Sequence, residues 1–310
     1  MRVVITGGTG FIGRQLTQSL TASGHTVVVL TRSPSGRPAT GSVRYAKWDG
    51  RSGSAWAQHL DGADAVVNLA GENIADGLWT KDRRQRILES RLLAGQACLE
   101  ALHQVRRLPT VFVQASAVGY YGDRDDIILG EEAPPGTGFL AEVAERWEAS
   151  TAPVETMGVR RVILRTAVVL GRQGGAFPRM LPPFRWYLGG PLGSGQQWFP
   201  WIHVQDEVGA IRWLMECPGL SGPFNLVAPG IVTQSTWAEA LGFSLGRPAR
   251  LRVPAWFLRL ALGAMAKELF LASARVEPGR LLESGYVFRF PSLSDALADL
   301  LHALPETTHA

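Results

Sequence analysis

Glycine residues at a regular spacing mark a segment that could hold a phosphate group. The sequence TGGTGFIG follows an apolar run directly and opens a segment with helical periodicity. Gly7 and Gly10 allow a tight turn and a close approach of the backbone to a phosphate, and Gly13 lets the helix lie close to the sheet. The free N–H groups at the helix start favour negative charge. The motif predicts a dinucleotide pyrophosphate loop, rather than a plain strand–turn–helix, made by Gly7, Gly10, Phe11, Ile12 and Gly13.

The end of the second predicted strand indicates which dinucleotide is preferred. An Asp or Glu normally stands there and accepts a hydrogen bond from the ribose 2′-hydroxyl of NAD(H). This chain has Thr31, Arg32 and Ser33 instead, so the carboxylate is missing. The Arg32 guanidinium can pair with a 2′-phosphate, and the two hydroxyls can add hydrogen bonds. The pattern favours NADP(H) over NAD(H), and the alternative is a solvated arginine on a strand-end turn.

Small residues also end the fourth predicted strand. Leu69, Ala70 and Gly71 follow the apolar run AVVN, and their small size leaves room for an adenine and its ribose. Close packing of the strand against its neighbours would favour the same residue types, so both interpretations stay open. A ligand at this place would lie at the carboxyl edge of the sheet, beside the glycine loop.

These motifs lie on alternating strands and helices. Apolar, β-branched runs predict strands at residues 2–6, 26–30, 43–46, 65–69, 110–115 and 161–170. Segments with helical periodicity lie between them at residues 11–22, 54–60, 81–105 and 138–155. Short strands joined by crossover helices require right-handed connections. The pattern therefore predicts an α/β protein with a doubly wound parallel sheet.

The local composition of the sequence changes after residue 171, where Gly- and Pro-rich loops begin. We expect residues 1–170 to form the dinucleotide-binding domain, with a sheet that can receive later strands. Residues 171–310 would form a smaller substrate-side part that ends in an apolar helical extension at about residues 249–301. Helices are predicted in this part at residues 206–216, 234–242, 254–271 and 293–301.

A substrate cleft is expected between the carboxyl ends of the strands and this second part. Its predicted walls are the Tyr120–Tyr121 turn and the loop at residues 174–201, where Arg179 and Arg185 could hold an anionic group. Alternation over residues 201–206 predicts a strand with a structural His203, followed by a helix with Asp206 as its N-cap. His, Cys and carboxylate residues are not clustered, so no metal site is predicted.

The composition excludes several classes of protein. Apolar residues make up 46% of the 310 residues and charged residues 19%, which excludes a disordered chain. The 31 basic residues exceed the 27 acidic ones only slightly, so we expect no nucleic-acid partner. Two distant cysteines exclude a disulfide scaffold and fit a reducing compartment. Charged residues interrupt the apolar stretch 255–274, which we interpret as a packed helix; a cytoplasmic protein without a membrane partner is expected.

Three further motifs reveal a family resemblance: NLAGENI at residues 68–74, SAVGYYG at 116–122 and GGPLGSGQQWFPWIH at 189–203. With TGGTGFIG and the apolar C-terminal segment, they make nearly the whole chain resemble the extended, atypical short-chain dehydrogenase/reductase superfamily. Within it, the chain is similar to NAD-dependent epimerase/dehydratase-like "epimerase family" proteins. The resemblance implies a Rossmann-type fold, NADP(H) as cofactor, and a small-molecule substrate. It also implies that Arg91 reaches the cofactor from its helix and that Val169 lines the nicotinamide side.

The chain departs from the superfamily at the catalytic residues. Active members use a Tyr as acid/base and, four residues later, a Lys that lowers the pKa of that Tyr. Phe139 and Val143 occupy these places in one register, and Leu140 and Ala144 occupy them in the other. Neither register supplies a hydroxyl or an amine. The superfamily's serine position is occupied by Ala117.

Substitute hydroxyls follow the fifth predicted strand. Ser116, Tyr120 and Tyr121 stand where a substrate carbonyl would meet the nicotinamide, which makes them the catalytic candidates, while Glu72 and Asn73 stand after the fourth strand. An unassisted Tyr has a pKa near 10, so it would donate a hydrogen bond rather than act as a base. Packing tyrosines and a turn serine are the alternative. Two functions remain: an NADP(H)-dependent oxidoreductase or epimerase acting on a carbonyl or secondary alcohol, and a non-catalytic NADP(H)-binding sensor or regulator.

Overall fold

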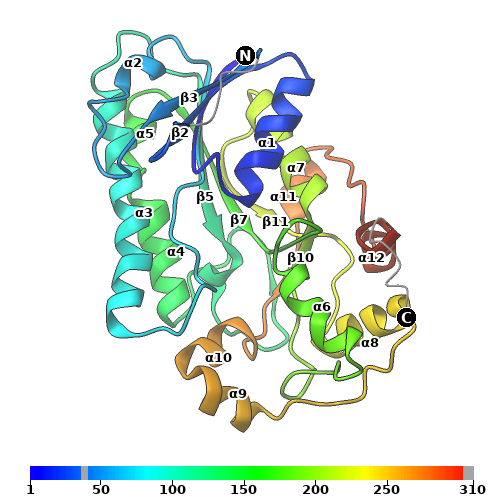
Figure 1. The fold of residues 1–310 in the computed structure, drawn as a ribbon. Helices are drawn as coiled ribbons and strands as arrows, with labels where there is room; N and C mark the ends of the chain where they lie inside the picture. Colours follow the sequence, from blue (N-terminus) through cyan, green and yellow to red (C-terminus); the bar gives the residue numbers. More distant parts are fainter. Residues whose placement is uncertain (36–40, 303–310) are drawn as a thin grey trace.

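A parallel sheet of seven strands organises the computed structural model, which describes residues 1–35 and 41–302 (Figure 1). The strand order is β11-β7-β5-β4-β1-β2-β3, and it reverses direction between β1 and β4. This arrangement confirms the doubly wound α/β fold, and its switch point is where such sheets bind ligands. The strands are β1 (Arg2–Thr6), β2 (Thr26–Thr31), β3 (Val43–Lys47), β4 (Ala65–Asn68), β5 (Val111–Ala117), β7 (Arg160–Thr166) and β11 (Gly222–Leu226).

Helices cover both faces of the sheet (Figure 1). Alternate residues of β1 serve opposite cores, because Val3 and Ile5 pack with Leu16 of α1, whereas Val4 packs with Cys98 of α3. Burial on both faces explains why the strands read as continuous apolar runs. One face carries α1 (Phe11–Ala22) and α7 (Val204–Glu216); the other carries α2 (Ala57–Leu60), α3 (Lys81–Leu102), α4 (Phe139–Ala149) and α5 (Pro153–Thr156).

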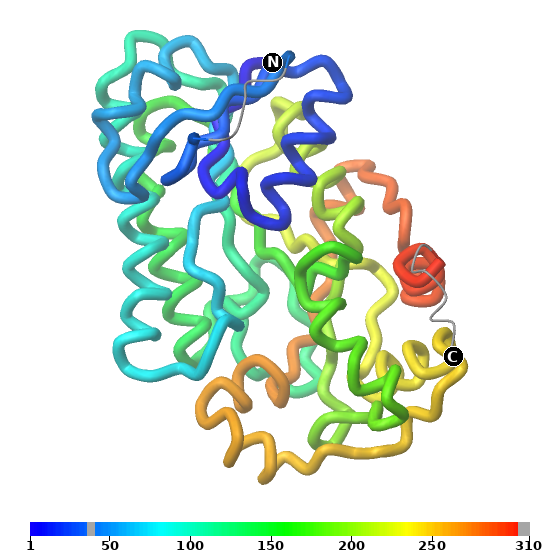
Figure 2. The backbone as a smooth tube through the Cα atoms, in the orientation of Figure 1, coloured from blue at the N-terminus to red at the C-terminus, as the bar shows by residue number. Residues whose placement is uncertain are grey.

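The substrate-side part has its own core, built around Trp237 and Phe177. It lies at the lower right of Figure 1, and the chain path through it is followed most easily in the tube of Figure 2. A small sheet joins it to the first part, since β8 pairs in parallel with β10 and antiparallel with β9. Its elements are β8 (Val168–Gly171), β9 (Gly174–Gly175), α6 (Phe177–Arg185), β10 (Trp201–His203), α8 (Gln234–Leu245) and α12 (Leu293–His302).

The C-terminal extension also crosses back to the first part. Strand β12 (Arg275–Val276) pairs with β6 (Ile128–Leu129), which follows the 3₁₀ helix η1 (Val118–Tyr121). Three short helices accompany it: α9 (Ala255–Leu262), α10 (Ala264–Leu269) and α11 (Gly279–Glu283). Among the described residues, no helix is both long and apolar enough to span a bilayer.

Several predicted elements are divided in the structure. The strand predicted at residues 161–170 is two strands, because the chain leaves the main sheet at Ala167 and β8 joins the small sheet. The helix predicted at 254–271 breaks at Gly263, whose φ of 57° ends α9. The helix predicted at 138–155 ends with α4, and α5 begins separately at Pro153.

Helix α6 and strand β11 are among the elements of the second part that were not predicted. Helix α6 lies inside the predicted loop 174–201 and contains Pro182 and Pro183, which obscure its periodicity. Strand β11 begins with Gly222 and Pro223 and pairs with β7 at the edge of the main sheet. The domain boundary at residue 170 stays a prediction, and β11 and α7 show that elements from beyond it complete the first part.

His203 caps helix α7, so the prediction of Asp206 as the N-cap is wrong. The Nδ1 atom of His203 accepts a hydrogen bond from the Gln205 N–H at 3.2 Å. Asp206 is buried inside the helix, where its carboxylate accepts hydrogen bonds from the backbone N–H groups of Arg289 and Phe290 at 2.7 and 2.9 Å. It therefore holds the C-terminal extension instead of starting the helix.

Stability is expected to fall by about 3 kcal/mol between pH 6.5 and about pH 4 because of His203. Burial lowers the pKa of His203 to about 4, although Asp299 opposes the shift and Arg172 and Arg289 add to it. The unfolded state therefore takes up the proton first, so the stabilisation present above pH 6.5 is lost as the pH falls. Urea unfolding at both pH values checks this. His203→Asn keeps a capping acceptor and should flatten the pH dependence, and an unchanged slope would contradict the assignment.

Candidate cofactor and active site

The glycine loop is folded against the end of β4. Gly7 has a φ of 68°, and a Cβ built on it would lie 2.6 Å from the Leu69 carbonyl oxygen. A Cβ on Gly13 would lie 2.4 Å from the Gly7 carbonyl oxygen, so this glycine makes room for the loop backbone itself. Helix α1 begins after Gly10 without a side-chain cap. Its first N–H groups therefore remain available for a phosphate at the switch point.

The Phe11 side chain packs against a hairpin from the substrate-side part. A Cβ on Gly171 or Gly174 would lie 2.4 or 2.5 Å from the Phe11 ring, and a Cβ on Gly175 would lie 2.4 Å from the Val169 carbonyl oxygen. Val169 is buried in β8, in the same core that Phe11 borders. The start of α1 and the β8–β9 hairpin are thus fitted to each other, and only the backbone of Phe11 is left for a ligand.

The end of β2 carries a guanidinium without a partner in the part of the chain that the structure describes. Thr31 is buried and its hydroxyl accepts a hydrogen bond from the Ser33 N–H, whereas Arg32 and Ser33 are exposed. Within residues 1–35 and 41–302, Arg32 makes no hydrogen bond or ion pair through its side chain. Its charge is therefore free to meet an anionic group at the edge of the sheet.

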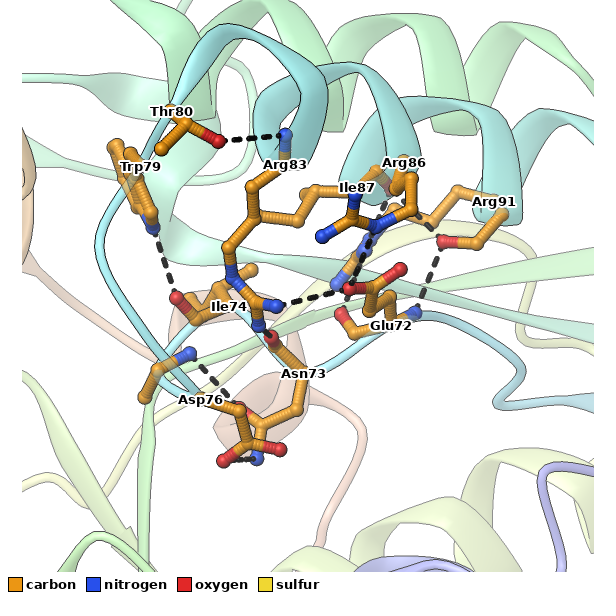
Figure 3. Close-up of polar contacts among 12 residues, drawn as sticks. Glu72, Asn73, Ile74, Asp76, Trp79, Thr80, Arg83, Arg86, Ile87 and Arg91 are labelled. Atoms are coloured by element: carbon orange, nitrogen blue, oxygen red, sulfur yellow. Dashed lines mark hydrogen bonds and ion pairs between the residues drawn. The ribbon is translucent and has the colours of Figure 1, made fainter.

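The loop after β4 is tied to the start of α3 (Figure 3). The Glu72 carboxylate lies 3.0 Å from the Arg83 guanidinium and 3.6 Å from that of Arg86. Arg83 also donates to the Asn73 carbonyl oxygen, and Trp79 donates to that of Ile74. Glu72 and Asn73, which the sequence placed near the reaction centre, are therefore engaged in shaping this loop.

Arg91 lies beneath the same loop, on α3 (Figure 3). It donates to the carbonyl oxygens of Glu72 and Ile87 at 3.0 and 2.8 Å, and a Cβ on Gly71 would lie 3.1 Å from its Cζ atom. Burial lowers the pKa of Arg91 to about 10, so the side chain still carries its charge at neutral pH. The Arg91 guanidinium also stacks 4.7 Å from the Trp147 ring, whose buried Nε1 lacks a partner among the described residues. A charge and a spare donor thus lie beside the end of β4.

Ser116 and Tyr121 belong to one buried polar network. Ser116 donates to the Glu148 carboxylate at 2.6 Å, and Arg165 pairs with both oxygens of that carboxylate at 3.0 Å. Arg165 also donates to the Tyr121 hydroxyl at 3.0 Å, which in turn donates to the Asn225 side chain at 2.7 Å. Although burial opposes it, Glu148 raises the pKa of Arg165 above its usual value. Both predicted catalytic hydroxyls therefore have protein partners in the structure.

Tyr120 is the predicted catalytic residue that keeps an accessible side chain. It is half-buried at the end of η1, and its ring lies over the Arg165 guanidinium at 3.6 Å. Burial raises the pKa of Tyr120, while Arg165 opposes that shift. The phenol therefore stays protonated at neutral pH and can donate a hydrogen bond. Arg165 fixes the position of the ring.

The places of the missing Tyr–Lys pair are filled by apolar packing. Phe139 is the first residue of α4, and Val143 is buried one turn later, in a cluster with Trp79 and Met265. The Glu268 carboxylate of α10 accepts hydrogen bonds from the N–H groups of Phe139 and Leu140 at 3.0 and 2.7 Å. The C-terminal extension thus caps the helix that carries the catalytic pair in other members of the superfamily. The alternative register, with Leu140 and Ala144, is equally apolar.

The predicted anion-binding arginines have different surroundings. Arg179 on α6 pairs with Asp76 at 2.5 Å and donates to the Ala75 carbonyl oxygen at 2.9 Å. It therefore bridges the loop after β4 and the substrate-side part, and Asp76 is the anionic group that it holds in this structure. Arg185, at the end of α6, is exposed.

Several residues of this site were not singled out from the sequence. They are Trp147, Glu148, Arg165 and Glu268, and each acts through a contact with a distant segment. One signal was present: Arg165 interrupts the apolar run VILRTAVVL, and a lone charge in a buried strand requires a partner.

The chain matches two protein-family models that together cover nearly its whole length. The model of the NAD dependent epimerase/dehydratase family matches residues 3–226, and that of a domain of unknown function, DUF1731, matches residues 253–300. The human epimerase family protein SDR39U1 is 38% identical over 97% of this chain and all of its own length. The epimerase family protein YfhF of Bacillus subtilis is 37% identical over 97% of this chain and 98% of its own.

Solved structures agree with this assignment. The crystal structure of human SDR39U1 (isoform 2) with NADPH superposes with a TM-score of 0.87 at 37% identity, over 98% of this chain and all of that one. The nucleoside-diphosphate sugar epimerase of Corynebacterium glutamicum has a TM-score of 0.78 at 33% identity, over 97% of this chain and 58% of that one. The glycine loop, the strand order and these matches together establish that the chain belongs to the NAD dependent epimerase/dehydratase family.

Proposed function

We propose that this protein binds NADP(H) and acts as an oxidoreductase or epimerase on a carbonyl or secondary alcohol of a small molecule. The observation that carries the proposal is Arg32 at the end of β2, whose side chain has no partner among the described residues, beside a glycine loop whose helix has no side-chain cap. The human relative crystallised with NADPH supports the same choice of cofactor. The name of the Corynebacterium glutamicum relative makes nucleotide sugars the first substrates to test.

The residues present fit such a cofactor. A Cβ on Gly7 would collide with the Leu69 carbonyl oxygen, so glycine lets the loop lie close against the end of β4, and the uncapped start of α1 would hold the pyrophosphate. Arg32, with the hydroxyl of Ser33, would hold the 2′-phosphate. Arg91 would hold the part of the cofactor that passes the end of β4. Val169 and the β8–β9 hairpin would border the nicotinamide side.

The mechanism that we propose uses a hydrogen-bond donor instead of a Tyr–Lys pair. Bound NADP(H) supplies or accepts the hydride at the substrate carbon. Tyr120 would donate a hydrogen bond from its hydroxyl to the substrate oxygen, because burial raises the pKa of Tyr120 and keeps the phenol protonated, and water would supply the proton that this oxygen takes up. Arg165 is a positioning residue that holds the Tyr120 ring. Ser116 fixes Arg165 through the Glu148 carboxylate, and Tyr121 fixes it through a direct hydrogen bond.

Replacing Arg32 with alanine is expected to weaken NADPH binding about 10- to 150-fold, the value of one charge-assisted pair, and to leave NADH binding unchanged. Calorimetric titration with both dinucleotides measures the difference. Arg51→Ala, which removes another exposed arginine, is the matched control. Equal affinity of the native protein for NADH and NADPH would contradict the cofactor assignment.

A second candidate function is a non-catalytic NADP(H)-binding sensor or regulator. The observation that favours it is the apolar filling of the Tyr–Lys places by Phe139 and Val143. NADPH consumption with nucleotide sugars and with activated carbonyl compounds separates the two candidates. Tight NADPH binding without turnover of any of these substrates would favour the sensor.

A further inference from the structure

Helix α9 exposes the side chains that a packed helix would bury. Trp256, Phe257 and Leu260 are 66%, 49% and 79% exposed, whereas Leu258 is the residue of this helix that is buried. The next helix behaves differently, because Met265 of α10 is buried against Trp79. The sequence-based interpretation of residues 255–274 as one packed helix is therefore wrong for α9. Its apolar face needs another explanation.

A second exposed apolar group continues this surface. Trp186, Tyr187 and Leu188 follow α6 and are 71%, 53% and 57% exposed. They lie beside the segment that leads to α9, since the Leu251 N–H donates to the Gly189 carbonyl oxygen and Leu192 bridges to Val253. The segment that follows α6 is thus paired at residues 189–192 with the segment that leads into α9, which Figures 1 and 2 show at the lower end of the molecule.

The charged residues within the two segments that carry these groups are all positive. Arg185, Arg250, Arg252 and Arg259 are exposed, and none of them forms an ion pair with a described residue. Residues 240–267 and 171–205 contain no Asp or Glu at all. Glu268, the first acidic residue after α9 in the sequence, is turned inward, and its carboxylate caps α4. We call the three apolar residues of α9, the three that follow α6 and these four arginines the basic–aromatic face.

We propose that the basic–aromatic face docks the protein on the surface of an anionic lipid bilayer. Aromatic and leucine side chains on one helical face, flanked by arginines, are the pattern of helices that lie in the plane of a membrane interface. Anionic headgroups would neutralise the unpaired arginines while the Trp and Leu side chains enter the acyl boundary. A second copy of this chain fits less well, because a symmetric contact would bring the same arginines face to face. This proposal replaces the expectation that the protein has no membrane partner.

Co-sedimentation with lipid vesicles tests the proposal on the full-length protein. We expect binding to vesicles of phosphatidylcholine mixed with phosphatidylserine, weak or no binding to phosphatidylcholine alone, and release at high salt. Trp256→Ser with Leu260→Ser should abolish binding. Val287→Ser, which removes an 85% exposed apolar side chain outside the face, should leave it intact. These side chains are exposed, so thermal unfolding should be unchanged in all variants.

Neutralising the arginines separates electrostatic docking from adhesion of apolar residues. Arg250→Gln and Arg259→Gln should each weaken binding to the anionic vesicles about fivefold, and about 25-fold together, whereas the control Arg51→Gln should not. Equal binding to both kinds of vesicle, or binding that no variant weakens, would overturn the proposal. So would a stable dimer in solution that Trp256→Ser with Leu260→Ser dissociates while vesicles remain unbound. None of these measurements depends on NADPH or on turnover.

Discussion

Replacing Glu148 with glutamine is expected to lower the free energy of unfolding by about 3–5 kcal/mol. Glu148 is buried and forms a two-point ion pair with Arg165, which is 4% exposed. Without the carboxylate, the Arg165 guanidinium would remain buried with its charge and without its ion-pair partner. Ser116 would also lose the acceptor of its hydroxyl proton. Urea unfolding of the two proteins at neutral pH measures the difference.

The same helix provides the matched control. Glu142 pairs with Arg146 at 3.1 Å, but their side chains are 57% and 50% exposed to water. Glu142→Gln should therefore cost less than about 1 kcal/mol. Replacing both Glu148 and Arg165 with methionine should recover much of the loss, because the uncompensated charge is removed with its partner. A cost for Glu148→Gln as small as that of Glu142→Gln would show that the network is not a structural element.

The fold could be predicted from the sequence because its signals are local. The glycine loop, the runs of β-branched residues and the helical periods each lie within a few neighbouring residues. The sheet follows from them, since crossover connections leave few topologies. Strand β8 could not be separated from β7 in this way, because residues 161–170 contain no glycine, proline or other turn signal and only the pairing of β8 with β10 shows where the sheet ends.

The cofactor-binding residues could be predicted from the sequence for the same reason, whereas the surroundings of the catalytic candidates could not. Gly7 and Arg32 adjoin strand ends that the pattern locates directly. Ser116 and Tyr121 also adjoin a strand end, but their partners Glu148 and Asn225 come from distant elements. Hydroxyls that looked available in the sequence are therefore already hydrogen-bonded in the fold. The inward turn of Glu268 has the same origin, since it depends on the packing of α10 against α4.

Replacing Tyr120 with phenylalanine is expected to lower kcat on a carbonyl substrate by about 10²- to 10³-fold, the usual value of one positioned hydrogen-bond donor to the reacting oxygen. The substitution removes the hydroxyl and leaves the ring over Arg165. NADPH affinity, measured by titration, should therefore be unchanged. Since burial raises the pKa of Tyr120, the native rate should be constant through neutral pH and fall only in strongly alkaline solution, where the phenol loses its proton.

Ser116 and Tyr121 provide the comparison that decides between the three hydroxyls. Tyr121→Phe removes a buried hydrogen bond to Asn225 and should lower stability more than Tyr120→Phe does. If Tyr120 is the donor, Ser116→Ala and Tyr121→Phe reduce the rate only as far as they displace Arg165. A large loss of kcat in Ser116→Ala with a normal rate in Tyr120→Phe would contradict our assignment.

Phe139→Tyr adds the hydroxyl of the superfamily at the start of α4, yet Val143 is buried among apolar side chains and leaves that hydroxyl without its lysine. We therefore expect Phe139→Tyr to leave the rate of Tyr120→Phe unrestored.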